Sequence, residues 1–422
     1  MNARTPPAGT LQALIDEAAQ ALEERVIAWR RDIHEHPELG NREFRTAGLV
    51  ADHLRRLGFD EVRTGVAYTG VVGLLRGGRP GPVVALRADM DALPVTEQTG
   101  LPFASRARAT WSGEEVGVMH ACGHDCHVAI LMGVAEILAG LRAQLPGTVK
   151  FIFQPAEEMP PPGEEGGARL MIQEGALEKP VPQAIFGLHV SSRLNAGVLG
   201  WREGATMASS DRFQITVQGR QSHGAAPWLG VDPIVTSAQI VLGLQTLVSR
   251  TVDITREPAV VTIGAIKGGV RENIIPDEVH MKGTIRTFDE QMRGDLHERV
   301  TTLAEAVARG SRAQCQVCIQ KGYDITYNDP ALTAKVVPTL QRVAGEANVQ
   351  RVDKVTGAED FSFFQKLVPG VFFFVGVTQP GIDPATAYSN HSPKFLVDES
   401  ALLLGLRALA HVTCDYLESA GG

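Results

Sequence analysis

The spacing of hydrophobic positions along the first two hundred residues alternates between helical and strand intervals. Apolar residues three and four apart predict amphipathic helices, whereas short β-branched runs bounded by glycine predict strands. The predicted helices span 14–40, 42–59, 124–141 and 166–177, and the predicted strands span 69–77, 81–91, 148–154 and 184–190. Strands and helices that alternate at this spacing predict an α/β fold, a mostly parallel sheet with helices on both faces.

The order of elements changes after residue 201. A strand, a helix, two strands, a helix and a strand follow, at residues 211–219, 231–250, 259–269, 278–288, 290–310 and 313–320. This β-α-β-β-α-β order is that of a ferredoxin-like domain. The pattern of the first domain then returns with a helix, a strand and a closing helix. We therefore predict a domain that covers 1–201 and 323–422, with a smaller domain at 202–322 inserted in it.

Composition and charge exclude several classes of protein. The 422 residues carry a net charge of −8, and lysine and arginine form no dense block, so we expect no nucleic-acid partner. No apolar run is long enough to cross a bilayer, and the start of the chain lacks the pattern of a secretion signal, so we expect a cytoplasmic protein with no membrane association. Five cysteines are too few for a disulfide framework. Cys315 and Cys318 lie in an alternating run and are interpreted as strand residues.

Side chains that bind metals follow several of the predicted strands. The loops at the carboxyl ends of parallel strands converge, so functional groups collect there. The candidate ligands in these positions are Cys122, His124, Glu158, His189 and His391. Five ligands exceed the four of a closed tetrahedral zinc site. With one further bridging ligand, they predict a centre for two divalent metal ions.

The doublet Glu157–Glu158 adds a catalytic hypothesis. A carboxylate that binds a metal is a poor base, so hydrolysis needs a second carboxylate that can take a proton from water. Adjacent loop residues can divide these duties, with Glu158 as metal ligand and Glu157 as general base. The alternative is a solvated acidic loop, because residues 157–165 contain four glutamates. The apolar strand that precedes the doublet favours the catalytic interpretation.

Ten stretches of the sequence together resemble the dinuclear-metal aminoacylases and carboxypeptidases, in the branch that contains hippurate hydrolases and indoleacetyl-amino-acid hydrolases. They are "RRDIHEHPELG", "ALRADMDALP", "MHACGHDCHVA", "FQPAEE", "FGLHV", "QSHGAAP", "GVRENIIPDE", "GTIRTFD", "GAEDFSFF" and "NHSP". The resemblance implies an enzyme that hydrolyses the amide bond of N-acyl amino acids, such as acetyl or benzoyl derivatives, by a metal-activated water with Glu157 as base. It also implies that the five candidate ligands hold two divalent ions.

The same resemblance implies roles for the inserted domain, which in the family is a lid that also pairs subunits. His223 matches a lid histidine that reaches the active site of the neighbouring subunit and stabilises the developing oxyanion. Asn273 and Arg286 match positions that hold the substrate carboxylate. A homodimer or a larger homo-oligomer is therefore expected.

Several polar residues near the candidate ligands have supporting roles in this interpretation. The motif "DMD" stands where many relatives have a histidine, one residue and an aspartate, which leaves the role of Asp89 open. We place Asp91 and Asp125 outside the metal site, where they orient ligand histidines. The remaining polar residues of these motifs are interpreted as packing or structural residues: His120, Cys126, His127, Glu359 and Asp360.

Other functions are weighed against the amidohydrolase. A dipeptidase or aminopeptidase on the same scaffold needs a pocket for a free amine, and a non-catalytic metal-binding protein has no need of the base Glu157. A redox role for the cysteine-rich motif predicts a disulfide between Cys122 and Cys126. The ligand set suits zinc, manganese, cobalt or nickel.

Overall fold

An eight-stranded sheet carries the predicted metal ligands. Within residues 10–419, which the computed structural model describes, the strand order is β1-β2-β6-β3-β7-β18-β8-β17. The strands are β1 (Glu61–Val66), β2 (Gly70–Arg76), β3 (Arg79–Asp89), β6 (Pro146–Gln154), β7 (Ala184–Asn195), β8 (Leu199–Trp201), β17 (Val349–Arg351) and β18 (Gly370–Thr378). Four of the seven neighbouring pairs are parallel, which confirms the predicted α/β class. The antiparallel pairs β1–β2, β2–β6 and β8–β18 were not predicted.

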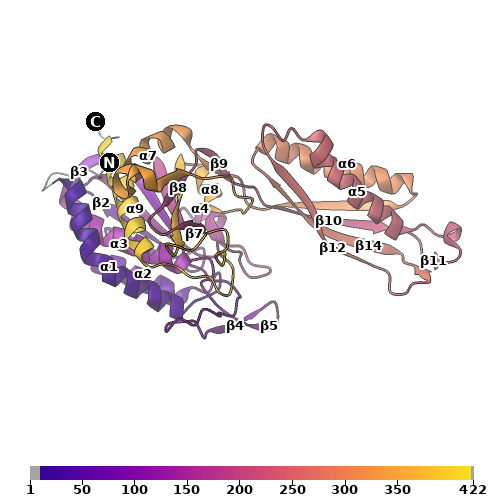
Figure 1. Cartoon of the computed structure of the whole chain (residues 1–422), viewed down its shortest axis with the longest axis horizontal. Helices are drawn as coiled ribbons and strands as arrows, with labels where there is room; N and C mark the ends of the chain where they lie inside the picture. The colour runs from indigo at the N-terminus through magenta and orange to yellow at the C-terminus, as the bar shows by residue number, and fades with distance from the viewer. Residues whose placement is uncertain (1–9, 420–422) are drawn as a thin grey trace. The chain divides into compact units, whose positions relative to one another are not determined.

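Helices cover both faces of this sheet. They are α1 (Leu11–Glu35), α2 (Phe44–Arg56), α3 (His124–Gly140), α4 (Gly167–Gln173), α7 (Pro330–Ala344), α8 (Phe361–Gln365) and α9 (Ser400–Ser419). Figure 1 shows α1, α3 and α9 side by side, and these helices pack against one another. The side chains of β6 alternate between the faces. Phe151 and Phe153 enter the hydrophobic core with α3 and α9, whereas Lys150 donates to the carbonyl oxygens of Ala176 and Glu178, which follow α4.

The carboxyl ends of the central strands bring distant parts of the chain to one edge of the sheet. Asp89 at the end of β3 pairs with Gln154 at the end of β6, and the chain then continues to Asp91 in one loop and to Glu157 in the other. His189 lies on β7, which neighbours β3. Helix α3 begins at this edge as well. In its first turn, His124 lies within hydrogen-bond distance of Asp91, and His127 accepts the backbone N–H of Val190. This is the edge at which the sequence predicts metal ligands.

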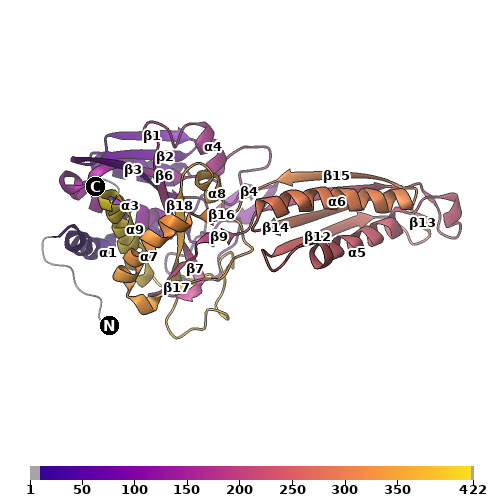
Figure 2. The same ribbon diagram turned by 90° about the horizontal axis from the view of Figure 1, so that it is seen from above.

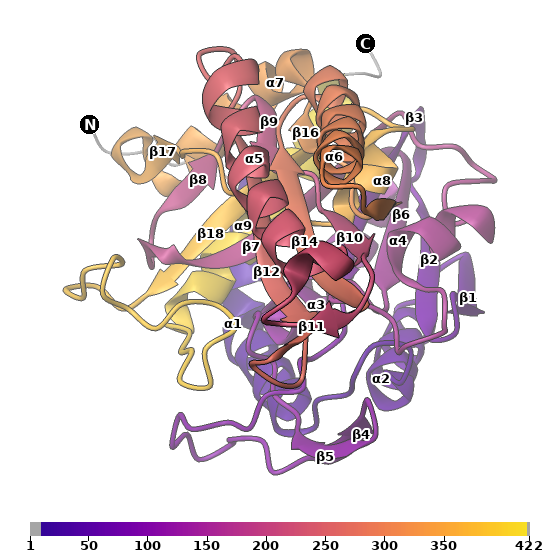
Figure 3. The same ribbon diagram turned by 90° about the vertical axis from the view of Figure 1, so that its right-hand side faces the viewer.

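A second sheet with two helices forms the inserted part. Its strands are β10 (Asp211–Gln218), β12 (Ala259–Gly268), β14 (Glu278–Thr287) and β15 (Gln314–Lys321), in the antiparallel order β12-β14-β10-β15. Helices α5 (Pro233–Thr251) and α6 (Glu290–Gly310) lie side by side along the strands in Figure 2 and on the same side of the sheet in Figure 3. The predicted βαββαβ lid is therefore present. Cys315 and Cys318 lie in β15, as predicted.

Six short strands form three small sheets that the sequence pattern did not reveal. They are β4 (Arg108–Trp111) with β5 (Glu114–Gly117), β9 (Gly204–Met207) with β16 (Thr326–Asn328), and β11 (Ser222–His223) with β13 (Ile274–Ile275). Strands of two to four residues are too short for a period in hydrophobicity to stand out. No helix of residues 10–419 combines the length and the apolar character needed to span a bilayer.

The chain divides into two compact units. One contains the residues up to Gly204, Tyr327–Asp353 and the residues from Phe363 onward, and the other contains Ala205–Thr326 and Lys354–Ser362. The predicted boundaries were 201/202 and 322/323, and the segment 354–362 was assigned to the larger domain. That segment joins the smaller unit because Met207 pairs with Val355, a bridge between single residues that leaves no pattern in the sequence.

Candidate metal centre

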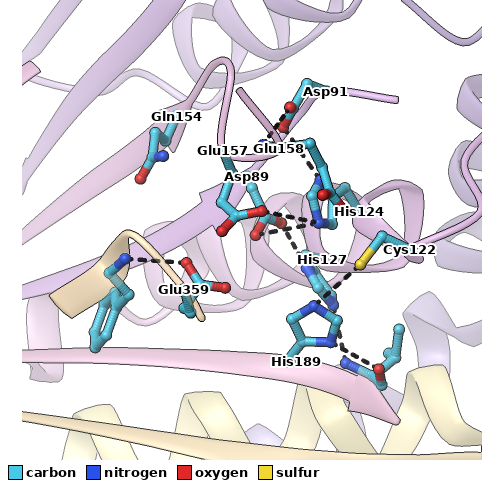
Figure 4. A network of polar contacts seen from close by, with 12 residues as sticks. Asp89, Asp91, Cys122, His124, His127, Gln154, Glu157, Glu158, His189 and Glu359 are labelled. Carbon is cyan, nitrogen blue, oxygen red and sulfur yellow. Dashed lines mark hydrogen bonds and ion pairs between the residues drawn. The ribbon is translucent and has the colours of Figure 1, made fainter. Parts of the chain in front are cut away.

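Two groups of metal-binding atoms share the thiol of Cys122. In the first, Cys122, His124 and His189 each offer a ligand atom, and in the second, Cys122, Glu158 and His391 do so; within each group these atoms lie within 4.8 Å of one another. The Sγ atom of Cys122 is 3.4 Å from His189 Nε2 and 3.3 Å from His391 Nε2. Figure 4 shows the thiol pointing toward the ring of His189. All five predicted ligands thus come together, with Cys122 at the centre.

The hydrogen bonds of two histidines leave their Nε2 atoms available to a cation. His189 donates from Nδ1 to the carbonyl oxygen of Val190 at 2.7 Å, and His124 Nδ1 lies 3.2 Å from Asp91 Oδ1. Among residues 10–419, the buried Nε2 atom of His124 has no hydrogen-bond partner. A buried nitrogen without a partner is costly unless a further group satisfies it. A divalent metal ion fits this position, because imidazole nitrogen and thiolate sulfur are both metal ligands.

The electrostatics of the cluster are those of a site that needs a cation. Burial raises the pKa of the Cys122 thiol well above its ordinary value, and the charges of Glu158 and Glu157 add to this effect. Burial opposes protonation of His124, but the carboxylates of Asp89 and Asp91 outweigh it and raise the His124 pKa to about 10. In the absence of a metal both groups therefore hold their protons at neutral pH. Metal binding must release these protons, since the ligating forms are thiolate and neutral imidazole.

Asp91 links two of the predicted ligands from outside the cluster. Its Oδ1 atom lies beside His124 Nδ1, and its Oδ2 atom accepts the backbone N–H of Glu158 at 2.9 Å. One buried carboxylate thereby fixes the ring of His124 and the loop that carries Glu158. Carboxylates in this position orient the ligand and raise its basicity.

Asp125 contacts neither His124 nor His189 through any of its hydrogen bonds. It accepts a hydrogen bond from Arg30 Nε at 2.7 Å and pairs with His34 Nδ1 at 2.8 Å, both on α1. Successive residues of a helix are rotated by about 100° around its axis, so Asp125 faces α1 when His124 faces the sheet edge. The placement of Asp125 beside a ligand histidine is therefore corrected, and the residue joins α3 to α1.

Glu157 lies at the cluster without belonging to either group of ligands around Cys122. Its side chain is buried, and its Oε2 atom is 4.0 Å from His124 Nε2. Its carboxylate also lies within 4.8 Å of ligand atoms of His124 and Glu158. Burial would raise the pKa of Glu158, but the hydrogen bond and charge of His391 lower it below its ordinary value. The doublet thus places one anionic ligand and one second carboxylate side by side.

The other polar residues of the cysteine-rich motif are packing residues. His127 donates from Nδ1 to Asp89 at 2.5 Å and accepts the N–H of Val190 at Nε2, at 2.9 Å, so both of its ring nitrogens are engaged. His120 is buried, and burial lowers its pKa to about 3. All five cysteines are free thiols, Cys126 among them, which gives no support to a disulfide between Cys122 and Cys126.

Comparison with known proteins gives the chain a family. The model of peptidase family M20/M25/M40 matches residues 85–415. The chain belongs to this family. It is 42% identical to thermostable carboxypeptidase 1 of Saccharolobus solfataricus, over 92% of this chain and 94% of that protein. It is 37% identical to an N-acetylcysteine deacetylase of Bacillus subtilis, over 95% of this chain and 99% of that protein.

A solved structure supports the same assignment. The crystal structure of a Bacillus subtilis protein described as a dinuclear metal-binding peptidase of the M20 family is 35% identical, with a TM-score of 0.78 over 94% of this chain and 99% of that chain. The present chain is accordingly a metal-dependent hydrolase of peptidase family M20/M25/M40.

One residue of this M20 site was quoted in a motif but given no role. The side-chain amide of Asn390 donates to the carbonyl oxygens of Cys122 at 2.9 Å and Val190 at 3.1 Å, and its oxygen accepts from Ser192. It ties together the loops that carry Cys122, His189 and His391. His391 itself has a φ of 72°, a strained backbone conformation that such cross-links hold in place. The position of Asn390 directly before the candidate ligand His391 was the signal in the sequence that could have identified its role.

The lid residues expected in the M20 site lie in two places. His223 is exposed on β11, and the N–H of the neighbouring Gly224 donates to the carbonyl oxygen of Asn273 at 2.8 Å. In the sequence both residues come before Glu278, the first residue of β14. Arg286 is half-buried near the other end of β14. It lies eight residues from Glu278, which corresponds to about 27 Å at about 3.4 Å per residue. The fold of one lid brings His223 and Asn273 together but does not bring Arg286 to them.

Proposed function

We propose that this enzyme hydrolyses the amide bond of N-acyl amino acids and releases a carboxylic acid and a free amino acid. The observation that carries the proposal is the position of Glu157, a buried carboxylate at the edge of a five-ligand cluster in which Glu158 supplies the neighbouring acidic ligand. A metal site with a purely structural role needs no carboxylate of this kind. The family relationship supports amide hydrolysis as the reaction class.

We propose that the five residues of the cluster would hold two divalent ions, since Cys122 belongs to both groups of possible ligand atoms. His124 and His189 would complete one position, and Glu158 and His391 the other. Zinc, manganese, cobalt or nickel suits this mixture of sulfur, nitrogen and oxygen ligands. When bound, the ions would polarise the amide carbonyl and lower the pKa of water.

The residues of the chain then divide the proton transfers between them. Glu157 takes a proton from the attacking water as the new C–O bond forms, and it returns that proton to the amine nitrogen as the C–N bond breaks. Asp91 holds His124 and the Glu158 loop in place throughout. His223 accepts the N–H of Ala225 at Nδ1, at 3.0 Å, so its neutral ring carries a proton on Nε2 that can be donated to the oxyanion.

Arg286 and Asn273 are proposed to bind the substrate carboxylate. Arg286 donates to Thr284 Oγ1 at 2.5 Å, which directs the guanidinium, and burial lowers its pKa from the ordinary arginine value. A half-buried guanidinium gains from a carboxylate partner, because its planar fork matches two oxygens. Since an N-acyl amino acid is far shorter than the separation of His223 and Arg286, one substrate needs these residues from two different lids.

A homodimer formed through the lid meets that requirement. The exposed face of α5 carries Val235, Ala238, Leu242, Gln245 and Ser249, and no charged residue occurs in α5 before Arg250. The exposed face of α6, in contrast, is rich in glutamate, aspartate and arginine. Leu242 is 70% exposed. An uncharged apolar stripe of this kind is typical of a subunit interface.

The interface is tested with the substitution Leu242→Glu. We expect the dimer to dissociate in light-scattering chromatography while the melting temperature of each unit changes little, because the side chain is exposed in the monomer. Ala306→Glu on the exposed face of α6 is the matched control and leaves the dimer intact. A variant that remains dimeric at low micromolar concentration places the interface elsewhere.

Peptide cleavage is the second candidate, and it is favoured by the carboxypeptidase name of the Saccharolobus relative. Both reactions cleave an amide next to a free carboxylate, so they differ in what precedes that amide. A panel of acetyl, benzoyl and indoleacetyl amino acids, free dipeptides and N-blocked peptides, assayed at defined metal content, separates them. Higher kcat/KM on free dipeptides would replace the N-acyl amino acid proposal.

The base is tested with Glu157→Gln, which removes the proton acceptor and keeps the shape of the side chain. General base catalysis contributes about 10²- to 10⁴-fold, so we expect kcat to fall by about 10³-fold. Metal content, measured by mass spectrometry, should stay unchanged because Glu157 is outside both ligand groups. A wild-type kcat in the variant with metal bound would reject Glu157 as the base.

A further inference from the structure

A buried glutamate outside the metal cluster reaches the loop that carries the general base. Glu43, at the start of α2, is fully buried. Its Oε1 atom accepts the backbone N–H of Ala156 at 2.9 Å, directly before Glu157. Its Oε2 atom accepts a hydrogen bond from Thr69 Oγ1 at 2.5 Å. The carboxyl group therefore joins α2, the start of β2 and the loop after β6.

The residue held by Glu43 has an unusual backbone conformation. Ala156 has a φ of 51°, in the left-handed region that residues with a side chain rarely adopt. Its Cβ atom is closely enclosed, because a Cβ atom built on Gly40 would lie 3.0 Å from it and one built on Gly166 would lie 3.2 Å from it. The turn persists because the surrounding backbone and the Glu43 carboxyl define it. Its direction decides where Glu157 points.

We propose that Glu43 is a positioning residue for Glu157: its hydrogen bond to the Ala156 amide fixes the left-handed turn from which the general base projects. The inference rests on the proposed role of Glu157. The hydrogen bonds of the Glu43 carboxyl go to Ala156 and Thr69, neither of which is a candidate ligand, so Glu43 acts through the loop. A displacement of a catalytic group by about 1 Å can cost about 10²-fold in rate, so the turn has a measurable catalytic value.

The electrostatics of Glu43 suit a neutral support rather than an anion. Burial raises the pKa of Glu43 to about 8, and the nearby charge of Asp91 contributes in the same direction. A neutral carboxyl avoids repulsion with Asp91, the carboxylate that orients His124 and Glu158. Its carbonyl oxygen still accepts the Ala156 N–H. Glutamine offers the same acceptor in a neutral group of the same shape, which supplies a conservative variant.

The first test compares Glu43→Gln with Glu43→Ala in the metal-loaded enzyme. We expect the glutamine variant to keep kcat within about threefold of wild type and the alanine variant to lose about 10- to 100-fold in kcat, with KM and metal content unchanged. Thr69→Val removes the second hydrogen bond and is expected to give a smaller loss, so the test stands if the alanine variant folds poorly. An alanine variant with wild-type kcat overturns the proposal, and so does a loss in both Glu43 variants that is equal in size.

The second test uses a double-mutant cycle. In the Glu157→Gln background the base is already absent, so Glu43→Ala should change the residual rate by less than about twofold. A merely structural residue would lower the residual rate by the same factor as in wild type, and that result would reject a role through Glu157. If Glu157→Gln itself is fully active, the proposed function fails before the role of Glu43 is tested.

The third test does not depend on activity or on metal. Hydrogen–deuterium exchange of the peptide 154–159 in the metal-free protein should be faster in Glu43→Ala than in wild type and unchanged in Glu43→Gln. Glu38→Ala is the matched control, because Glu38 accepts the N–H groups of Arg45 and Thr46 in the first turn of α2 and has no bond to Ala156. It should lower the stability of α2 and leave exchange at 154–159 unchanged. Wild-type exchange in Glu43→Ala would show that the turn does not need Glu43.

Discussion

The residues expected to form the active site fall into two sets. The fold of one chain brings the members of the first set together and does not bring all members of the second set together. In the larger unit, five residues from four separate stretches of the chain come within ligand distance of Cys122 or of one another. Four of them are buried or partly buried and His391 is exposed, and hydrogen bonds fix His124 and His189 in orientations that leave Nε2 available. In the lid, His223 is exposed on β11, whereas Arg286 lies on β14 about 27 Å along the strand from Glu278, the first residue of β14. One chain brings the first set together, whereas we propose that the second set acts only when two chains combine.

The contrast between the five-residue cluster and the lid residues is tested most severely by a substitution of Cys122. Because both groups of ligand atoms contain its thiol, Cys122→Ala should remove both ions and lower kcat/KM by about 10³-fold or more. His391→Ala should remove one ion, since His391 belongs to one group. Metal content per chain, measured after dialysis against a low concentration of free metal, distinguishes these outcomes.

Cys126→Ala is the control for this substitution. Cys126 is a buried free thiol four residues away that belongs to neither group, so the variant should keep both ions. If Cys122→Ala binds two ions as tightly as wild type, the thiol is not the shared ligand.

The lid set is tested with His223→Ala, for which we expect kcat to fall by about 10²- to 10³-fold because one oxyanion donor is lost. Metal content should not change, since the residue lies outside the cluster. His280→Ala, which alters another exposed lid histidine, is the control and should keep wild-type kcat.

Mixed dimers decide whether His223 acts across subunits. Random exchange between His223→Ala and Glu157→Gln chains makes about half of the dimers hybrids. In each hybrid one of the two sites has both Glu157 and the His223 of the other chain, so about a quarter of the wild-type activity should return. No recovery, in samples where mass spectrometry shows that hybrids have formed, would place His223 in the site of its own chain.

A smaller effect is expected at Asp91, which supports the first set from outside. Removal of such a partner costs about 10- to 100-fold in metal affinity, so Asp91→Asn should weaken binding by that factor in a chelator competition. Asp125→Asn should instead lower the free energy of unfolding and leave metal affinity close to wild type, because its partners are Arg30 and His34. Equal losses of affinity in the two variants would contradict the different roles assigned to these aspartates.

The convergence of the five candidate ligands could be predicted from the sequence because it depends on a simple property of the sheet. Residues that follow parallel strands meet at one edge, so Glu158 and His189 could be placed together without knowledge of distances. Cys122 and His124 could be placed there as well, since a helix begins at His124. The order of elements in the lid was predictable for a similar reason, because its strands and helices are long enough to show a period.

Features that depend on pairing between distant elements were not predictable. Asp125 could not be assigned to Arg30 and His34 without the packing of α1 against α3. The cross-links of Asn390 and the hydrogen bond that the Ala156 N–H donates to Glu43 join residues more than one hundred positions apart. Period and composition describe one segment at a time, so they carry no information on which segment a side chain meets.

The smallest effect on the metal site is expected from a change in the core of the lid. Asp211 on β10 is buried and accepts hydrogen bonds from Arg293 at 2.6 and 2.8 Å and pairs with His297 at 2.7 Å. Burial opposes ionisation of Asp211, but these partners outweigh it and hold the Asp211 pKa below its ordinary value. Breaking a buried ion pair costs about 3 to 5 kcal/mol, so Asp211→Asn should destabilise the lid by about 3 kcal/mol at pH 7.

The pH dependence of this effect has a definite sign. A lowered pKa in the folded state means that Asp211 contributes its full stability above the ordinary carboxyl pKa of about 4 and loses it as the pH falls toward the lower folded value. The free energy of opening of β10 and α6 can be measured by hydrogen exchange. The difference in this free energy between wild type and Asp211→Asn should therefore be constant from pH 7 to pH 5 and become smaller below about pH 4. Metal content at pH 7 should be the same in both proteins, because the five ligands lie in the other unit. Loss of metal in Asp211→Asn would mean that the two sets of site residues are not independent, and the contrast between them would not hold.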